Sequence, residues 1–86
     1  MKSRRTKSFQ RLFSKLPTNI QDLAKKSYKL WIYDQSHPSL HFKKIQDNPE
    51  IYSVRIGIHW RAIGVVKEDF IYWHWIGSHE DYNKMI

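Results

Sequence analysis

The feature that most constrains the fold of this chain is a change in hydrophobic spacing near residue 40. Before this point apolar residues repeat at intervals of three and four, as on one side of a helix. After it they alternate with period two, as on one face of a strand. The first helical stripe comprises Phe9, Leu12, Phe13 and Leu16. It predicts a helix of about two turns, with Ser8 as the candidate N-cap and Pro17 as the residue that ends it.

A second helical stripe follows Pro17 and predicts a longer helix. Thr18 and Gln21 have the spacing of a capping box, in which Gln21 would reach back toward Thr18. Because a residue before proline avoids the helical region, His37-Pro38 is expected to end this helix. Its apolar side carries Ile20, Leu23, Ala24, Ser27, Leu30 and Trp31. Trp31 is expected in the core.

The alternating half predicts four strands over residues 40–45, 52–58, 59–66 and 70–76, of which the last is the most buried. The first has a slip near Lys43-Lys44, and Gly57 bends the chain before the third. Since only short turns join them, the strands form an antiparallel meander. Both helices must then cover one face and leave the other bare, which gives a two-layer α+β fold. Residues 1–7 form either a frayed tail or a short first strand.

Length and cysteine content narrow the class of protein. A chain of 86 residues and 10.5 kDa is expected to form one domain over residues 1–86. The absence of cysteine excludes disulfides, zinc–thiolate sites and a cysteine nucleophile. No apolar run has the roughly 20 residues of a membrane span, and the basic N-terminus lacks the apolar stretch of a signal peptide. We therefore expect a cytoplasmic protein that does not bind a membrane.

The charge is distributed unevenly along the chain. Residues 1–30 hold nine lysines and arginines and one acid, for a charge of +8, whereas residues 31–86 carry −1. A basic half predicts a polyanionic or acidic partner, although a merely solubilising surface is an equal alternative for a charge run alone.

The sequence offers little for covalent, metal or cofactor chemistry. No serine–histidine pair occurs in a nucleophile elbow, and no glycine-rich phosphate loop is present. His37 and His41 are four residues apart, but Pro38 breaks the helix that this spacing needs for a shared metal ion. We expect no metal site and no cofactor.

The remaining polar residues suit the cleavage of RNA. Arg55 and Arg61 are predicted on adjacent strands across the Gly57 bend, with His59 on the same side of its strand as Arg61. The segment 77–84, after the last strand, adds a dense set of titratable groups. Cleavage without a metal needs a base for the 2′-OH proton, cations for the charge that builds on phosphorus, and an acid for the leaving 5′-oxygen.

Simpler interpretations of the same residues stay open at this point. The two arginines would also suit surface ion pairs with Glu50, Glu68 or Asp69. His79 would also suit an ordinary turn. Base stacking and core packing are competing roles for Trp60, Trp73 and Trp75, and core packing is the more frequent role.

Two stretches resemble a known family. The segments YSVRIG at 52–57 and HWRAI at 59–63 resemble the arginine-bearing strand pair of the RelE/ParE toxin superfamily of type II toxin–antitoxin modules. The ending WIGSHEDYNKMI at 75–86 is similar to that of HigB-like members. The order of elements also agrees, so the resemblance covers nearly the whole chain. It implies a RelE-like fold, with two N-terminal helices on one face of an antiparallel sheet in the order β-α-α-β-β-β.

The resemblance implies an mRNA interferase, an endoribonuclease that cuts messenger RNA in the ribosomal A site and inhibits growth. Arg61, His79 and Tyr82 match catalytic positions of the family. Trp60 and Gly64 depart from its usual residues. The first sheet strand, rich in lysine in the family, retains only two lysines here. The predicted RNA- and phosphate-binding residues are Arg55, Lys43, Lys44, His59 and Lys84.

Two other functions and one partner complete the expectations. A ParE-like toxin that poisons DNA gyrase by binding shares the fold and the arginine strands. A basic domain that binds nucleic acid without cleaving it would also explain the charge. The expected partner is an acidic, partly disordered antitoxin that folds along the helices or the sheet edge. The free chain is expected to be a monomer or a weak dimer.

Overall fold

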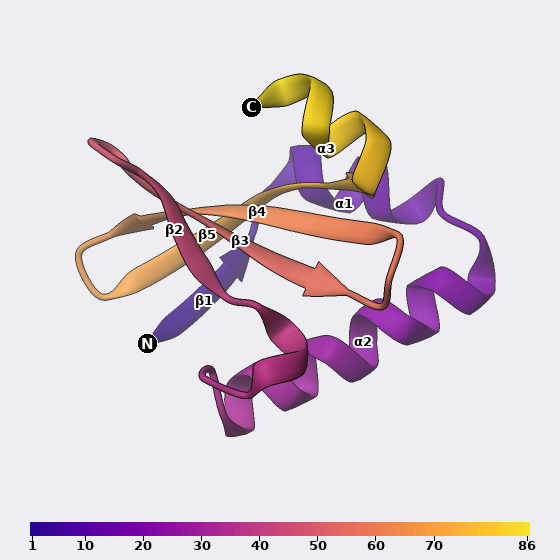
Figure 1. Ribbon diagram of the computed structural model, residues 1–86, viewed down its shortest axis with the longest axis horizontal. Helices are drawn as coiled ribbons and strands as arrows, with labels where there is room; N and C mark the ends of the chain where they lie inside the picture. Colours follow the sequence, from indigo (N-terminus) through magenta and orange to yellow (C-terminus); the bar gives the residue numbers. More distant parts are fainter.

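The computed structural model describes all residues from 1 to 86 and has an α+β fold (Figure 1). Five strands form one sheet in the order β1-β5-β4-β3-β2. The elements, in chain order, are β1 (Lys2–Arg5), α1 (Lys7–Ser14), α2 (Thr18–Tyr33), η1 (Pro38–Leu40), β2 (Lys43–Asp47), β3 (Glu50–Ile56), β4 (Trp60–Lys67), β5 (Phe70–Ser78) and α3 (His79–Met85). The α+β class is confirmed, and the expected order is extended by one strand and a C-terminal helix.

The N-terminal residues form a strand, which decides between the two alternatives for residues 1–7. Strand β1 pairs with β5 in parallel, so the sheet is mixed and only its other strand pairs are antiparallel. Thr6 ends this strand and also caps α1, because its side-chain oxygen accepts a bond of 3.2 Å from the backbone N–H of Phe9. The expected N-cap, Ser8, instead lies inside the first turn of α1.

The boundaries of α2 differ from the expected ones at both ends. Pro17 is the N-cap, so Thr18 is already helical and forms no capping box. Gln21 instead donates its amide to the carbonyls of Phe13 and Leu16, at 3.2 and 3.1 Å, and so caps the end of α1. The helix ends at Tyr33, four residues before the expected proline stop, because Asp34 turns the chain and accepts hydrogen bonds from Ser36.

The first strand of the alternating half begins later than expected. Leu40 lies in η1 with its side chain fully in the core, and β2 starts only at Lys43. The predicted slip is confirmed as a register shift between Lys44 and Gln46. The alternating apolar pattern therefore located a buried residue, Leu40, that does not lie in a strand.

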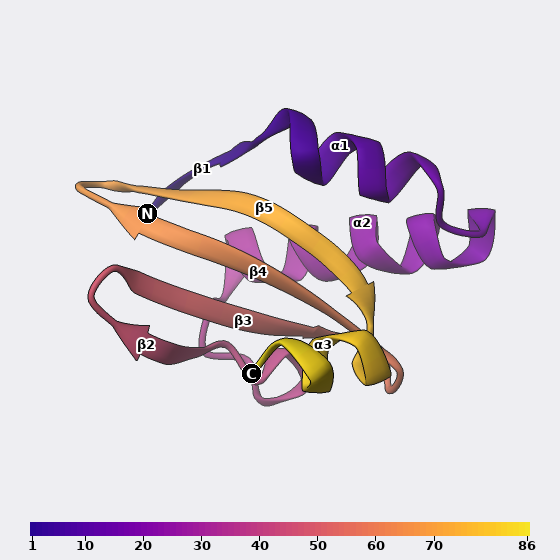
Figure 2. The same cartoon turned by 90° about the horizontal axis from the view of Figure 1, so that it is seen from above.

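The helices α1 and α2 cover one face of the sheet and bury the main core against it (Figure 2). Trp31 from α2 is only 2% exposed and meets Trp73 of β5 edge to face at 5.6 Å, which confirms both as core residues. Gly64 lies on the same face. A Cβ there would come within 2.9 Å of Ile71 and Trp73, so these large side chains occupy the space that a bulky residue would need. No helix is long and apolar enough to cross a membrane.

The opposite face is not entirely bare, because α3 covers one end of it. Figure 1 shows the sheet between α3 at the top and α2 at the bottom. Ser78 caps α3 by accepting a 3.1 Å bond from the N–H of Asp81. Tyr82 of α3 is 6% exposed, and Ile63 beneath this end of the face is 3% exposed. The expectation of a fully open face is wrong at this end. The helix could not be predicted because the polar segment 79–85 has no strong apolar stripe.

Candidate functional site

Arg55 and Arg61 lie directly opposite each other on β3 and β4. Cross-strand partners share a face, and the apolar neighbours Val54 and Ala62 point into the helix-covered core, so both arginines lie on the other face. Neither arginine has a carboxylate within ion-pair distance, because the two ion pairs of the protein both use Lys44. The alternative of surface ion pairs for the arginines is therefore wrong.

Backbone carbonyls hold both guanidinium groups. Arg55 donates from Nε to the carbonyl of Gly57 at 3.0 Å, and Arg61 donates from Nη1 to the carbonyl of Trp60 at 3.0 Å. Burial lowers the pKa of the Arg61 guanidinium, the neighbouring Arg55 cation lowers it further, and Tyr82 acts in the opposite direction. Arginine keeps its charge under such shifts, so the two strands present two adjacent fixed cations with free N–H donors.

Helix α3 adds Tyr82 and His79 to this pair. The Tyr82 ring lies 5.9 Å from the Arg61 guanidinium carbon, which is a cation–π distance. His79 is the first residue of α3, one turn before Tyr82, and its backbone N–H donates to the carbonyl of His59. Its Nε2 lies 3.1 Å from the side-chain amide of Asn83, whereas its buried Nδ1 has no partner. The half-buried ring is thus held in one place, unlike that of a free turn residue.

The structure does not bring all the other predicted residues to the arginine face. His59 lies in the turn before β4, exposed, so it does not share a strand face with Arg61 as expected. Lys43 is in register with Ser53 and shares the arginine face. Lys44 is in register with Tyr52 on the other face and pairs with Asp47 and Glu50. Lys84 is exposed in the last turn of α3.

One residue at the site escaped the sequence reasoning, which considered His41 only as a metal ligand. Its Nε2 lies 3.4 Å from Nη1 of Arg55, and its backbone adopts a left-handed conformation with φ of 44° after η1. No local sequence pattern predicts this contact, because the turn that places His41 beside Arg55 depends on the tertiary packing of Leu40. No group of three histidine and carboxylate side chains lies together in a way that could hold a metal ion.

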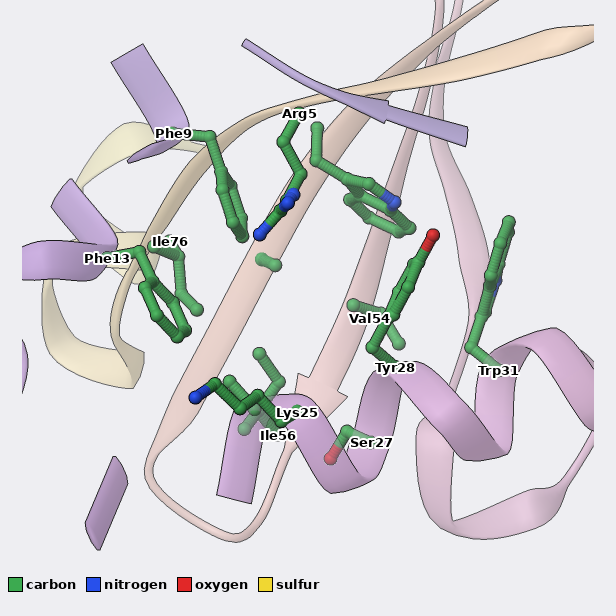
Figure 3. Close-up of a pocket in the computed structure, with 13 residues that line it drawn as sticks. Arg5, Phe9, Phe13, Lys25, Ser27, Tyr28, Trp31, Val54, Ile56 and Ile76 are labelled. Atoms are coloured by element: carbon green, nitrogen blue, oxygen red, sulfur yellow. The ribbon is translucent and has the colours of Figure 1, made fainter. Parts of the chain in front are cut away.

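A second candidate surface is an apolar groove of about 100 Å³ on the helix-covered face. Figure 3 shows aromatic side chains on both sides of it, Phe9 and Phe13 on one and Tyr28 and Trp31 on the other. Arg5 from the end of β1 and Lys25 from α2 also line it. The groove therefore combines apolar walls with two cations that no carboxylate of the chain neutralises.

Comparison with known proteins gives a family and a fold for the chain. Residues 18–84 match the family described as ParE-like toxin domain. Among solved structures, the chain is similar to a copper-bound mutant toxin from Helicobacter pylori, with 22% sequence identity and a TM-score of 0.71 over 94% of this chain and 97% of the other. Curated protein sequences give no match.

The structural match shows the RelE-like toxin fold, and the family match spans most of the chain. The protein therefore belongs to the ParE-like toxin domain family, within the RelE/ParE superfamily that the sequence resemblance indicated. It is the toxin of a toxin–antitoxin module, and its class implies an antitoxin partner.

Proposed function

We propose that this toxin cleaves messenger RNA at the arginine pair, without a metal ion. The observation that carries the proposal is the directly opposed, uncompensated pair Arg55 and Arg61, with Tyr82 against the second arginine and His79 one turn earlier on the same helix. Two cations held opposite each other repel, and a phosphodiester between them would relieve the repulsion.

The reaction transfers the phosphate ester to the neighbouring 2′-oxygen. A base takes the 2′-OH proton, the 2′-oxygen bonds to phosphorus, the bond to the 5′-oxygen breaks, and an acid gives that oxygen a proton. The products are a 2′,3′-cyclic phosphate and a free 5′-hydroxyl, so no further reactant is required. Arg55 and Arg61 hold the phosphate oxygens, whose negative charge grows in the transition state.

We assign one proton transfer to His79, because an imidazole nitrogen can both accept and donate a proton. Its Nε2 is the reactive nitrogen, since it can exchange the Asn83 amide for substrate while Nδ1 stays buried. His41, the exposed imidazole beside Arg55, is the second titratable group at the pair. Tyr82 orients Arg61 through its ring, which lies 5.9 Å from the guanidinium carbon.

The proposed place of cleavage is the ribosomal A site. The test is a reconstituted translation reaction with purified toxin, in which new 5′ ends are mapped on the messenger with and without ribosomes. We expect cuts that depend on ribosomes and disappear with Arg61→Ala but persist with Lys15→Ala, a charge removal on the exposed C-terminal side of α1. Arrest of protein synthesis without any cut messenger would contradict the proposal.

A gyrase poison is the second candidate, because the matching family is described as ParE-like. Such a toxin would need the fold and its charged surface but no acid–base group. Inhibition of DNA supercoiling by stoichiometric purified toxin, unchanged by His79→Gln, would favour this candidate over RNA cleavage.

For the antitoxin we propose an acidic amphipathic segment that folds into the apolar groove. Its apolar side would pack on the aromatic walls, and its carboxylates would pair with Arg5 and Lys25. The double variant Arg5→Glu and Lys25→Glu should weaken binding of the acidic protein encoded beside the toxin at least about tenfold, because like charges would then meet. Lys15→Glu, outside the groove, is the matched control. If the wild type, the double variant and Lys15→Glu bind the antitoxin equally well, the antitoxin binds elsewhere.

A further inference from the structure

The end of the sheet face farthest from α3 carries a cluster of aromatic and cationic side chains. Phe70 and Tyr72 of β5 stack at 5.9 Å, with 27° between their rings. The Arg4 guanidinium lies 4.9 Å from the centre of the Phe70 ring, and the Lys2 ammonium lies 5.7 Å from it. We call Lys2, Arg4, Phe70 and Tyr72 the corner cluster.

The corner cluster lies on the same face as the arginine pair. Ile71 and Trp73 point into the helix-covered core, so Phe70 and Tyr72, which alternate with them along β5, point to the opposite face. Lys2 and Arg4 are their register partners on β1, and Lys67 of β4 is paired with Phe70. Gly77, the register partner of Arg61, lies five residues along β5 from Tyr72. At the usual rise of a strand, this separation is about 16 Å.

The core does not account for this cluster. Neither aromatic ring belongs to the core, and both are only half-buried. No carboxylate pairs with either cation, although Asp69 is near in sequence and its carbonyl accepts a backbone bond from Lys2. The face between the cluster and the arginine pair also carries no acidic strand residue, since Asp47 and Glu50 lie on the other face with Lys44.

We propose that the corner cluster is a second RNA subsite, which binds single-stranded messenger on one side of the scissile phosphate. Tyr72 stacks on a base, and Arg4, Lys2 and Lys67 bind flanking phosphates. Every base has a π face, so such a subsite holds the strand without selecting its sequence. The inference rests on the proposed function and adds the path of the strand, from the arginine pair along β5 to β1.

RNA fits this surface better than an acidic peptide does. The cluster combines two stacked rings with two cations over the Phe70 ring, and aromatic rings beside cations are the arrangement that binds unpaired bases and phosphates. An amphipathic peptide needs an apolar groove, and the chain has its groove on the other face of the sheet. The two faces thus separate the two kinds of partner.

The first test measures binding of a fluorescent single-stranded RNA of about ten nucleotides by anisotropy. Tyr72→Leu should weaken binding about tenfold, because it removes a stacking surface and leaves the charge unchanged. Tyr72→Phe keeps the ring and should restore wild-type binding. Tyr33→Leu is the matched control, since this tyrosine of α2 is 88% exposed and lies outside the cluster. Thermal unfolding of each variant verifies that it folds.

The second test uses salt. Arg4→Gln should make the plot of log binding constant against log salt concentration shallower by about 0.7, the contribution of one phosphate contact to a single strand. Lys15→Gln should leave the slope unchanged. Wild-type affinity in Tyr72→Leu, or an unchanged slope in Arg4→Gln, would overturn the subsite. The subsite would also be overturned if the Tyr72→Leu and Arg4→Gln variants lost antitoxin binding but kept wild-type RNA binding.

These outcomes can be told apart from failure of the proposed function. If RNA binding falls in Tyr72→Leu but no messenger is cut by the wild type, the subsite stands and the cleavage mechanism is wrong. If the wild type cuts messenger and Tyr72→Leu binds and cuts equally well, the mechanism stands and the subsite is wrong.

Discussion

The two faces of the sheet contain different kinds of residue. The face under α1 and α2 is filled by large apolar side chains, and two cations, Arg5 and Lys25, line its groove. The opposite face carries cations without carboxylate partners, half-buried aromatic rings and a short polar helix at one end. The first face is covered by packed helices. The charges on the second face have no carboxylate of this chain to neutralise them and can bind a ligand. We infer that substitutions on the first should change stability and that substitutions on the second should change activity.

The largest expected effect is that of His79→Gln. Loss of a general acid or base should lower messenger cleavage by roughly 100- to 10,000-fold. The measurement is the rate of messenger cutting from about pH 5.5 to 8.5, with His37→Gln as the control because that ring hydrogen-bonds to Ser39 and to neither arginine. Full activity with an unchanged pH profile in folded His79→Gln would make His79 structural and move the role to His41, Glu80, Tyr82 or the ribosome.

Arg61→Ala should have the next largest effect. Removal of a fixed cation at the scissile phosphate should cost about 100- to 1000-fold in rate, or about 3–4 kcal/mol of transition-state stabilisation. Because the arginine does not titrate in this range, the loss should be the same at every pH. The same cutting assay checks this, together with urea unfolding. If Arg61→Ala lost activity only because it lost stability, the two faces would be less distinct than we infer.

Gly64→Ala tests the helix-covered face. The new methyl group would lie 2.7–2.9 Å from Ile71 and Trp73, and overpacking of this kind costs about 1–3 kcal/mol. Urea unfolding should therefore show a lower free energy of unfolding, whereas the folded fraction should cut messenger at the wild-type rate. Lys26→Ala, on the exposed side of α2, should change stability by no more than about 0.5 kcal/mol. Equal stability of both variants would show that the core has room at Gly64.

The smallest effect concerns His74. Burial lowers its pKa below the ordinary value of about 6.5, so below that pH the unfolded chain binds a proton that the folded chain resists. Stability should therefore fall as the pH drops below about 6.5, until the pH reaches the lowered pKa of the folded state. His74→Gln should make this part of the curve flatter in thermal unfolding at several pH values. An identical slope in both proteins would show that other histidines carry the dependence.

Part of the fold could be predicted because it depends on local spacing. Helical and alternating apolar stripes located both N-terminal helices and the last three strands, and they placed Trp31 in the core. The errors occurred where a distant contact decided the local structure. Thr6 replaced Ser8 as a cap because it also bonds Trp73, and Gln21 bonds the end of α1 instead of its own helix.

The candidate site could be predicted only in part, for a related reason. The sequence spacing placed Arg55 and Arg61 on adjacent strands, and the structure adds that they are direct register partners without carboxylates. The position of Lys44 could not be predicted, because the register shift in β2 decides which face each residue joins. His41 and the corner cluster likewise depend on contacts between segments that are far apart in the chain.

The sequence by itself determined the α+β class, the helix-then-strand order, the basic N-terminal half and the residue types available for chemistry, because these depend on composition and on spacing within one element. Only the tertiary structure decided which side chains meet. The parallel pairing of β1 with β5 brings Arg4 to Phe70, and the turn into α3 brings Tyr82 to Arg61. Such contacts arise when the whole apolar surface is buried at once, and no short stretch of sequence specifies that packing.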